Sequence, residues 1–146
     1  MQKIIQVIRS KTFDIMLVLW TILLGLIIPI LLVNGRSELV RRVSRIWSHG
    51  IILGLKYVVG LKHQEVGRSN LPKGQVIIAC NHQSAWETLV FNVFIPDVCI
   101  VLKKSLYKLP VFGWYLKRSP MIAIDREDGR EATRILLKQF NIFRRD

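Results

Sequence analysis

The sequence is poor in the residues and patterns that mark several common protein classes. It has two cysteines, Cys80 and Cys99, and both stand in apolar, strand-like runs, which predicts buried thiols in a reducing compartment. No spacing of His, Cys, Asp or Glu fits a metal site, and His49 and His63 stand alone. Helix-turn-helix, zinc-finger and RNA-binding signatures are missing too, as are internal repeats and low-complexity tracts. The sequence therefore gives no support for a metal ion or for a nucleic-acid partner.

Acidic residues are scarce as well. Ten Asp and Glu stand against 22 Lys and Arg, so the 146-residue chain carries a formal net charge of +12. Hydrophobic residues nevertheless make up 51% of the chain, which is a high share for a soluble domain. A chain that is both apolar and basic is suited to a membrane surface with anionic lipid, and it attracts acidic substrates.

The N-terminal region contains the longest uncharged stretch. Residues 15–33 are 19 successive positions without a charge, and a membrane-spanning helix needs about 20. Basic residues flank both ends, so their charge gives no orientation, and a hairpin that enters and leaves on one side is an alternative. A cleaved signal peptide is the weaker interpretation, because no small-residue cleavage site stands out. Residues 38–49 predict an amphipathic helix that lies in the bilayer interface or, alternatively, is an ordinary surface helix. We therefore expect residues 1–59 to be a membrane anchor with interfacial helices.

The remaining residues, 60–146, alternate between short apolar runs and helical patterns. The patterns predict strands at 76–80, 98–102 and 121–124, and helices at 85–95 and 128–143. Strands that alternate with helices indicate a parallel sheet, so the expected fold class is α/β. We expect an N-terminal hydrophobic membrane helix or hairpin, followed by an αβ domain.

The most informative stretch lies between the first predicted strand and its helix. Residues 81–88 are Asn-His-Gln-Ser-Ala-Trp-Glu-Thr, and Ser84 and Glu87 have the Ser-x-x-Glu spacing of a helix capping box. If Ser84 caps the helix, His82 lies in the loop and Glu87 in the first turn, so the two side chains can converge. Glu87 is then either a capping carboxylate alone or the partner that orients His82 as a general base.

Two cations follow the other predicted strands. Lys103 comes after the strand at 98–102, and Arg126 comes after the strand at 121–124. In one parallel sheet the carboxyl ends of the strands meet at one edge, so both cations would gather near His82. Solvated charges at strand ends are the ordinary alternative. Because a guanidinium binds phosphate oxygens in a bidentate way, Arg126 is the stronger phosphate-binding candidate and Lys103 the weaker.

Residues 81–88 resemble the first motif of the membrane glycerolipid acyltransferases, the 1-acylglycerol-3-phosphate O-acyltransferase family. That family has a histidine, four residues and then an acid, which is Asp in most members and Glu87 here, as in a bacterial subset. Residues 123–126 (Ala-Ile-Asp-Arg) resemble the second motif, and 102–104 (Leu-Lys-Lys) and 110–114 (Pro-Val-Phe-Gly-Trp) fit the bacterial pattern between the two. The resemblance extends over roughly residues 67–143. The third motif, Phe-Pro-Glu-Gly-Thr, is expected a little further on, and the sequence ends at Asp146 without it. The resemblance therefore implies that residues 60–146 are the N-terminal part of an αβ acyltransferase domain, that is, an incomplete αβ acyltransferase-type domain.

The resemblance implies acyl transfer from an acyl thioester, on coenzyme A or acyl carrier protein, to the free hydroxyl of a lysophospholipid. The acceptor it implies is 1-acylglycerol-3-phosphate, and the product is phosphatidate. His82 and Glu87 would be the catalytic residues, Arg126 with Lys103 would hold the acceptor's phosphate, and no metal or resident cofactor is implied. The reaction would take place at the cytoplasmic face of the inner (cell) membrane, where thioester donors reside.

A protein without catalytic activity is the alternative from a different class. The third motif is missing, and three strands are few for a sheet, whose outer strand would keep an unpaired edge. Both features also fit a non-catalytic membrane-associated protein or a truncated, inactive acyltransferase fragment.

Overall fold

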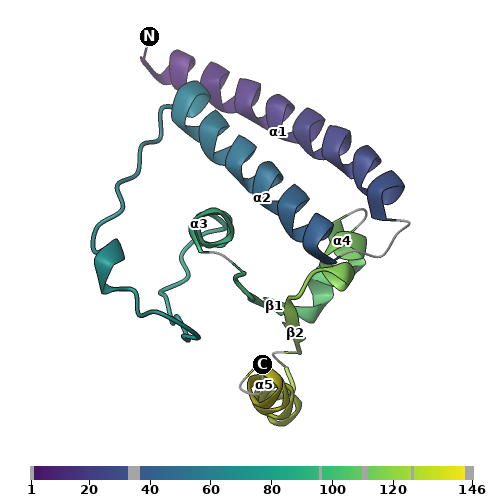
Figure 1. Ribbon diagram of the computed structural model, residues 1–146. Coiled ribbons are helices and arrows are strands. Elements are labelled where there is room, and N and C mark those ends of the chain that lie inside the picture. The colour runs from purple at the N-terminus through teal and green to yellow at the C-terminus, as the bar shows by residue number, and fades with distance from the viewer. Residues whose placement is uncertain (1, 33–36, 96, 110–111, 126, 144–146) are drawn as a thin grey trace.

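The computed structural model is built mainly from helices (Figure 1). It describes residues 2–32, 37–95, 97–109, 112–125 and 127–143, and the side chains of these residues except 27–32, 37 and 140–143. Five α-helices and two strands are described: α1 (Gln2–Leu32), α2 (Ser37–Gly54), α3 (Trp86–Phe94), β1 (Val101–Lys103), α4 (Phe112–Arg118), β2 (Ile122–Ile124) and α5 (Gly129–Phe143). Shorter helical turns cover Leu55–Val59, Arg68–Asn70 and Lys104–Lys108.

Helices α1 and α2 form an antiparallel hairpin (Figure 1). Two indoles join the helices reciprocally: Trp20 Nε1 donates to the carbonyl of Trp47 at 3.1 Å, and Trp47 Nε1 donates to Thr21 Oγ1 at 3.1 Å. The backbones of α1 and α2 can approach closely because α2 has glycine, at Gly50 and Gly54, where side chains of α1 contact it. A Cβ added at Gly50 would lie 2.6 Å from the Trp20 indole. The hairpin is therefore held by shape as well as by hydrogen bonds.

The core lies where α4 and β1 pack on α2. Its buried members are Val40 and Val43 of α2, Leu102 of β1, and Tyr115 and Leu116 of α4. The Tyr115 hydroxyl donates to the carbonyl of Val40 at 2.8 Å, which satisfies a phenol that would otherwise be buried without a partner. Val40 and Val43 of α2 are thus covered by protein, whereas Ile46 of the same helix is 52% exposed.

Strands β1 and β2 pair in parallel, with Val101 opposite Ile122 and Lys103 opposite Ile124. Helix α5 follows β2, and its start is fixed by Asp128, whose Oδ1 accepts the N–H of Glu131 at 3.0 Å. That contact is the capping half of the Asp-x-x-Glu pattern in the sequence. The second and third predicted strands and the helix at 128–143 are therefore present, although the strands are three residues long.

The α/β prediction is nevertheless wrong for the described residues, which are mostly helical with two short strands. The predicted strand at 76–80 is irregular and exposed, and Ile77 is 76% exposed. A strand is stable only when another backbone pairs with it, and no described strand lies alongside this segment. Because the segment 76–80 does not pair with any described strand, Cys80 at its end is exposed and not buried as predicted.

The membrane-spanning helix predicted at 15–33 is also wrong. Over the ranges that the structure describes, no helix is long and apolar enough to cross a membrane. Helix α1 begins at Gln2, so the uncharged stretch shares one helix with Lys3, Arg9, Lys11 and Asp14. One side of this helix is moreover occupied by α2.

Candidate active site

The candidate site lies at the start of α3, where a short loop is held by one carboxylate. Glu87 Oε1 accepts the N–H of Gln83 at 2.9 Å, and Oε2 accepts the N–H of Ser84 at 3.1 Å. Ser84 Oγ accepts the N–H of Trp86 at 3.1 Å. The helix begins at Trp86 with Ala85 as its N-cap, one residue later than predicted. Glu87 therefore does reach back over the N-terminus as a capping carboxylate does.

The same carboxylate faces a histidine. His82 Nδ1 lies 3.6 Å from Glu87 Oε2. The histidine side chain is 58% exposed, whereas that of Glu87 is 19% exposed. Since Nδ1 is turned towards the carboxylate, Nε2 at the other side of the ring is the nitrogen left for a substrate hydroxyl. The structure thus brings the two residues together as their placement on loop and helix predicted. The capping hydrogen bonds of Glu87 are formed, whereas His82 lies at ion-pair distance from the carboxylate without a hydrogen bond to it.

Hydrogen bonds keep Glu87 ionised. The N–H of Gln83 contributes most, followed by the N–H of Glu87 itself and by Ser84, and together they hold the pKa of the Glu87 carboxyl below its ordinary value. A carboxylate that stays charged near neutral pH can stabilise an imidazolium beside it. The arrangement suits a base that gains a proton transiently.

The phosphate-binding candidates are placed less completely. Lys103 ends β1, and the parallel register sets it opposite Ile124, the last residue of β2. Lys103 and the chain that leaves β2 therefore share one edge of the two-stranded sheet. Arg126 lies outside the described residues. Because 76–80 does not join the sheet, the predicted reason for His82 to lie at this edge is wrong.

An apolar cavity of about 110 Å³ lies between α1, α2, α3 and α4. Thr88 and Leu89, which directly follow Glu87, line it together with Leu24, Trp47 and Phe112. From the sequence, the apolar segment around Phe112 could equally have been core packing or the wall of an acyl channel. In the structure Phe112 lines the cavity, and Tyr115 and Leu116 of the same helix are core residues that line it as well.

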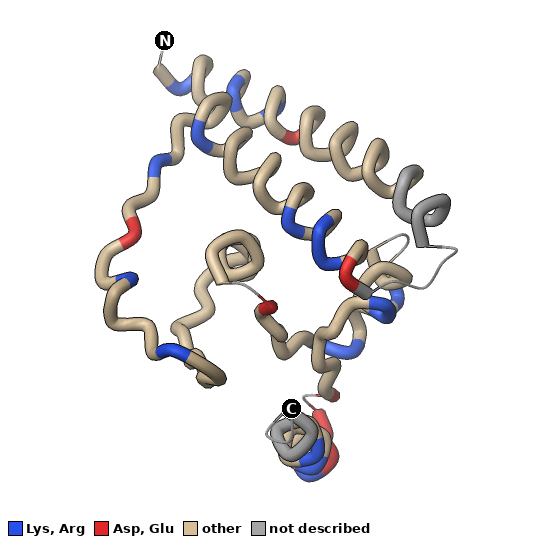
Figure 2. Tube along the Cα trace, viewed as in Figure 1, with Lys and Arg blue, Asp and Glu red and all other residues tan. Residues whose placement is uncertain are grey.

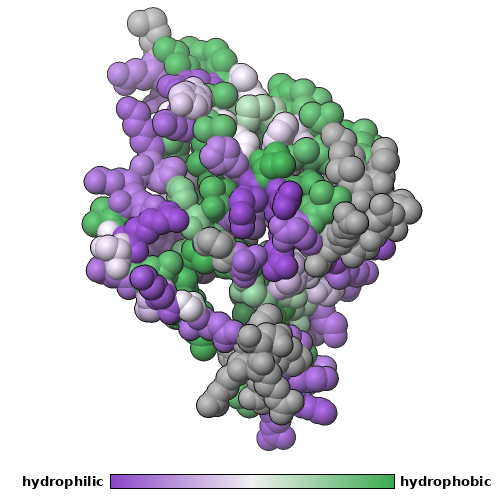
Figure 3. All heavy atoms as spheres, viewed as in Figure 1, coloured by the Kyte–Doolittle hydropathy of each residue, from purple (hydrophilic) through white to green (hydrophobic). Residues whose placement is uncertain are grey.

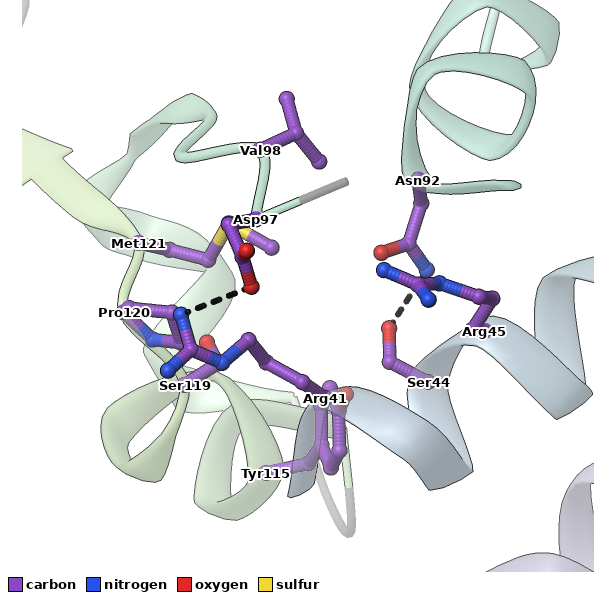
Figure 4. Close-up of a pocket in the computed structure, with 10 residues that line it drawn as sticks. All are labelled: Arg41, Ser44, Arg45, Asn92, Asp97, Val98, Tyr115, Ser119, Pro120 and Met121. Carbon is purple, nitrogen blue, oxygen red and sulfur yellow. Dashed lines mark hydrogen bonds and ion pairs between the residues drawn. The ribbon is translucent and has the colours of Figure 1, made fainter. Parts of the chain in front are cut away.

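A much smaller cavity, about 10 Å³, adjoins the apolar one and shares Ser44, Asn92 and Tyr115 with its lining (Figure 4). That is room for about one water molecule. Arg41 and Arg45 of α2 line it, and Arg41 Nη1 lies 3.4 Å from Asp97 Oδ1. Asn92 of α3 lines it too, and sequence reasoning did not single out this residue. Elsewhere too, the described side chains include no group of three or more His, Cys, Asp or Glu placed to hold a metal ion.

Comparison with known proteins decides the family. The model of the family described as Acyltransferase matches residues 62–145, which include His82, Glu87, Lys103 and Arg126. The chain belongs to the Acyltransferase family. This confirms the resemblance that its motifs predicted.

Three curated acyltransferases are similar in sequence to the chain. The chain is 34% identical over 139 residues to the 1-acyl-sn-glycerol-3-phosphate acyltransferase of Pseudomonas aeruginosa, covering 92% of this chain and 53% of that protein. Proteins of the same name match from Saccharomyces cerevisiae, with 34% identity over 58% of this chain and 28% of the relative, and from Helicobacter pylori, with 30% identity over 54% and 33%. The chain thus spans about half the length of the first of these relatives and less of the others. No solved structure matches it.

Proposed function

We propose that this acyltransferase transfers an acyl group from a thioester to the free hydroxyl of 1-acylglycerol-3-phosphate, giving phosphatidate. The observation that carries the proposal is the 3.6 Å approach of His82 Nδ1 to a Glu87 carboxylate that the loop backbone keeps in place. The printed names of the relatives support the choice of acceptor. The donor is acyl-coenzyme A or acyl-acyl carrier protein.

In the proposed mechanism His82 is the general base. Its Nε2 takes the hydroxyl proton as the acceptor oxygen attacks the thioester carbonyl carbon. The carbon–sulfur bond then breaks, and the leaving thiolate takes the proton back from the imidazolium. Glu87 orients the ring and stabilises its cationic state. A protein nucleophile is not required, because a thioester is already activated for direct attack.

Substrate binding divides between charge and apolar surface in this proposal. Arg126, with Lys103, holds the acceptor's phosphate, since a guanidinium fork matches phosphate oxygens. The apolar cavity beside Thr88 and Leu89 offers a place for part of an acyl chain close to Glu87. A net charge of +12 favours both the phosphorylated acceptor and the acidic donors.

We further propose that α1 holds the protein on the cytoplasmic face of the cell membrane. Among the described side chains of α1, ten large apolar ones are exposed: Ile4, Ile5, Val7, Ile8, Ile15, Val18, Leu19, Ile22, Leu23 and Leu26. At about 100° per residue they fall on one face, opposite the face that packs on α2. Apolar side chains cover much of the outer side of α1 (Figure 3), and its basic residues lie in its first half (Figure 2). An apolar face bordered by cations fits an anionic lipid surface.

The function is tested by acyl transfer to lysophosphatidate with purified protein in lipid. Wild type should form phosphatidate, and His82→Ala should lower the rate by about 10²- to 10⁴-fold with an unchanged fold. His49→Ala is the matched control, because His49 is exposed on α2 and has no role in the mechanism. An active His82→Ala protein would rule out the mechanism.

Membrane association is tested by flotation with vesicles that contain anionic lipid. The protein should float and resist a high-salt wash, since buried apolar area is not screened by salt. Ile15→Glu combined with Leu19→Glu should abolish flotation. Leu137→Glu, at an equally exposed leucine on α5, should not.

A further inference from the structure

A buried polar contact joins α3 to α2. Asn92 Nδ2 donates to Ser44 Oγ at 2.6 Å and to Ser48 Oγ at 2.8 Å, and Figure 4 shows the first of these bonds. Both serines are buried: Ser44 is 8% exposed and Ser48 is 1% exposed. Buried hydroxyls need hydrogen-bond partners, so these bonds are costly to lose.

The contact fixes α3 in two directions. Ser44 and Ser48 are one turn apart on α2, so one amide group bridges two points along that helix. A slide of α3 by one residue, about 1.5 Å, would break at least one of the bonds, and so would a large rotation. Most of the residues around Asn92 in α3 are apolar, and apolar packing alone specifies such positions less sharply.

The same helix carries Glu87, five residues before Asn92. Along the axis of an α-helix, five residues correspond to a rise of about 7.5 Å. Helix α3 packs mainly on α2. Its other side meets an exposed segment, where Arg68 Nη2 donates to the carbonyl of Phe94 at 2.9 Å. The packing of α3 on α2 therefore determines the position of the Glu87 carboxylate. Because Glu87 binds the loop that contains His82, this packing also determines the position of that loop.

We propose that Asn92 is a positioning residue for the His82–Glu87 pair. Its two hydrogen bonds transmit the position of the α1–α2 hairpin to the carboxylate. The inference rests on the proposed function, because it assigns Asn92 a part in acyl transfer. Asn92 acts on the pair through α3, and it also lines the apolar cavity assigned above to part of an acyl chain.

The variants separate positioning from general stability. Asn92→Leu keeps the approximate volume and removes both donors. Ser44→Ala with Ser48→Ala removes both acceptors and leaves α3 unchanged. Asn92→Asp should rescue, because its carboxylate accepts from both hydroxyls, and Arg41 and Arg45 line the same small cavity and offset its charge. Val40→Ala is the stability control, since Val40 is a buried core residue that takes no part in this contact.

The kinetic result expected is a loss of kcat of about 10- to 100-fold in Asn92→Leu and in the double serine variant, because a carboxylate misplaced by about 1 Å costs that much. KM should change less than kcat, because the three altered side chains line only part of the wall of the apolar cavity. Asn92→Asp should recover most of kcat, and Val40→Ala should lower Tm without lowering kcat. Unchanged kcat in Asn92→Leu, or an Asn92→Asp protein as slow as Asn92→Leu, would overturn the proposal.

Amide hydrogen exchange separates this proposal from the proposed function. Glu87 protects the N–H groups of Gln83 and Ser84. Their exchange should speed up in Asn92→Leu and stay slow in Val40→Ala. If wild type transfers no acyl group, the proposed function fails, and the exchange data still decide whether Asn92 positions Glu87. Equal exchange in Asn92→Leu and wild type would show that it does not.

Discussion

The α1–α2 hairpin and the segment that holds His82 are stabilised in opposite ways. The hairpin depends on contacts between residues distant in sequence, such as the reciprocal indole bonds of Trp20 and Trp47. The loop of residues 81–85 is exposed, and the hydrogen bonds that hold it to Glu87 run between residues at most four positions apart. We therefore expect substitutions in the hairpin to change stability, and substitutions at the dyad to change rate.

Among the substitutions that test this difference, Glu87→Gln should have the largest effect, and the effect should be on kcat. An amide oxygen can still accept the N–H groups of Gln83 and Ser84, so Tm at neutral pH should change little. It cannot stabilise an imidazolium, so kcat should fall by at least about 10²-fold. Steady-state kinetics and thermal unfolding on the same samples measure both. An unchanged rate would leave Glu87 with a capping role alone.

The same variant gives a pH dependence. Because folding lowers the pKa of Glu87, the stability that its charge contributes is present above its ordinary value of about 4.5. It is lost as the pH falls through the lower, folded value. Any advantage of wild type over Glu87→Gln in Tm should therefore be present at pH 7 and shrink on acidification below 4.5. An advantage that grew on acidification would contradict this sign.

Arg126→Ala should have the next largest effect, on acceptor binding. The acceptor's phosphate is present throughout the reaction, so the Arg126 guanidinium should bind it equally well before and during acyl transfer. Loss of this interaction should raise KM for lysophosphatidate about 10- to 100-fold with little change in kcat. Arg126→Lys should recover part of the affinity, because a point charge does not reproduce the fork.

An acceptor without a phosphate and an Arg130→Ala control complete this test. Wild type should strongly prefer the phosphorylated acceptor, and Arg126→Ala should lose that preference. If Arg126→Ala still prefers the phosphorylated acceptor as strongly as wild type does, another cation binds the phosphate, and Lys103 and Lys104 are the next residues to test. Arg130→Ala, a few residues further on, should behave as wild type.

Gly50→Ala tests the hairpin half of the comparison. Its new Cβ would meet the rigid Trp20 indole at 2.6 Å and disturb the bond from Trp20 Nε1 to Trp47. Overpacking of this kind typically costs about 1–3 kcal/mol. At Gly54 the atom met is the flexible Met16 Cε, and alanine also favours the helix, so Gly54→Ala should be near neutral. Denaturant unfolding measures the difference, and equal stabilities would show that the indole yields freely.

The smallest effect should come from Tyr115→Phe. Losing the hydrogen bond to the Val40 carbonyl should cost about 1 kcal/mol at neutral pH. Burial raises the pKa of Tyr115 to about 12, while a hydrogen bond from Ser44 lowers it slightly. A phenol held neutral in the fold stabilises fully below pH 10 and progressively less as the pH rises towards 12. The variant's deficit in unfolding free energy should therefore narrow above pH 10, and a deficit independent of pH would argue against that burial.

Local signals in the sequence predicted local structure well. The start of α3 was placed within two residues, and the Asp128 cap of α5 was found, because capping depends on residues three positions apart. The strand at 76–80 was wrong because a strand depends on a neighbour that its own residues do not specify. The spanning helix was wrong because the uncharged run gave no sign that Trp20 faces α2.

The candidate site was likewise predictable only in its local part. The meeting of His82 and Glu87 follows from a break between loop and helix, whereas their catalytic roles stay a prediction. Asn92 was missed, although a lone amide in an apolar helix is a signal that it has a buried partner. Its partners, Ser44 and Ser48, lie 48 and 44 residues away, and no pattern within α3 points to them.

The contact between Tyr115 and Val40 also sets an order of events during synthesis. Helices α1 and α2 are neighbours in the chain and can pair as soon as both have left the ribosome, since local contacts form first. The hydroxyl that satisfies the Val40 carbonyl is 75 residues further along. At about 5–20 residues per second it follows about 4–15 s later. During that interval α4 is not yet there to cover the apolar face of α2, so the nascent hairpin is the stage at which we expect the chain to be most prone to aggregation.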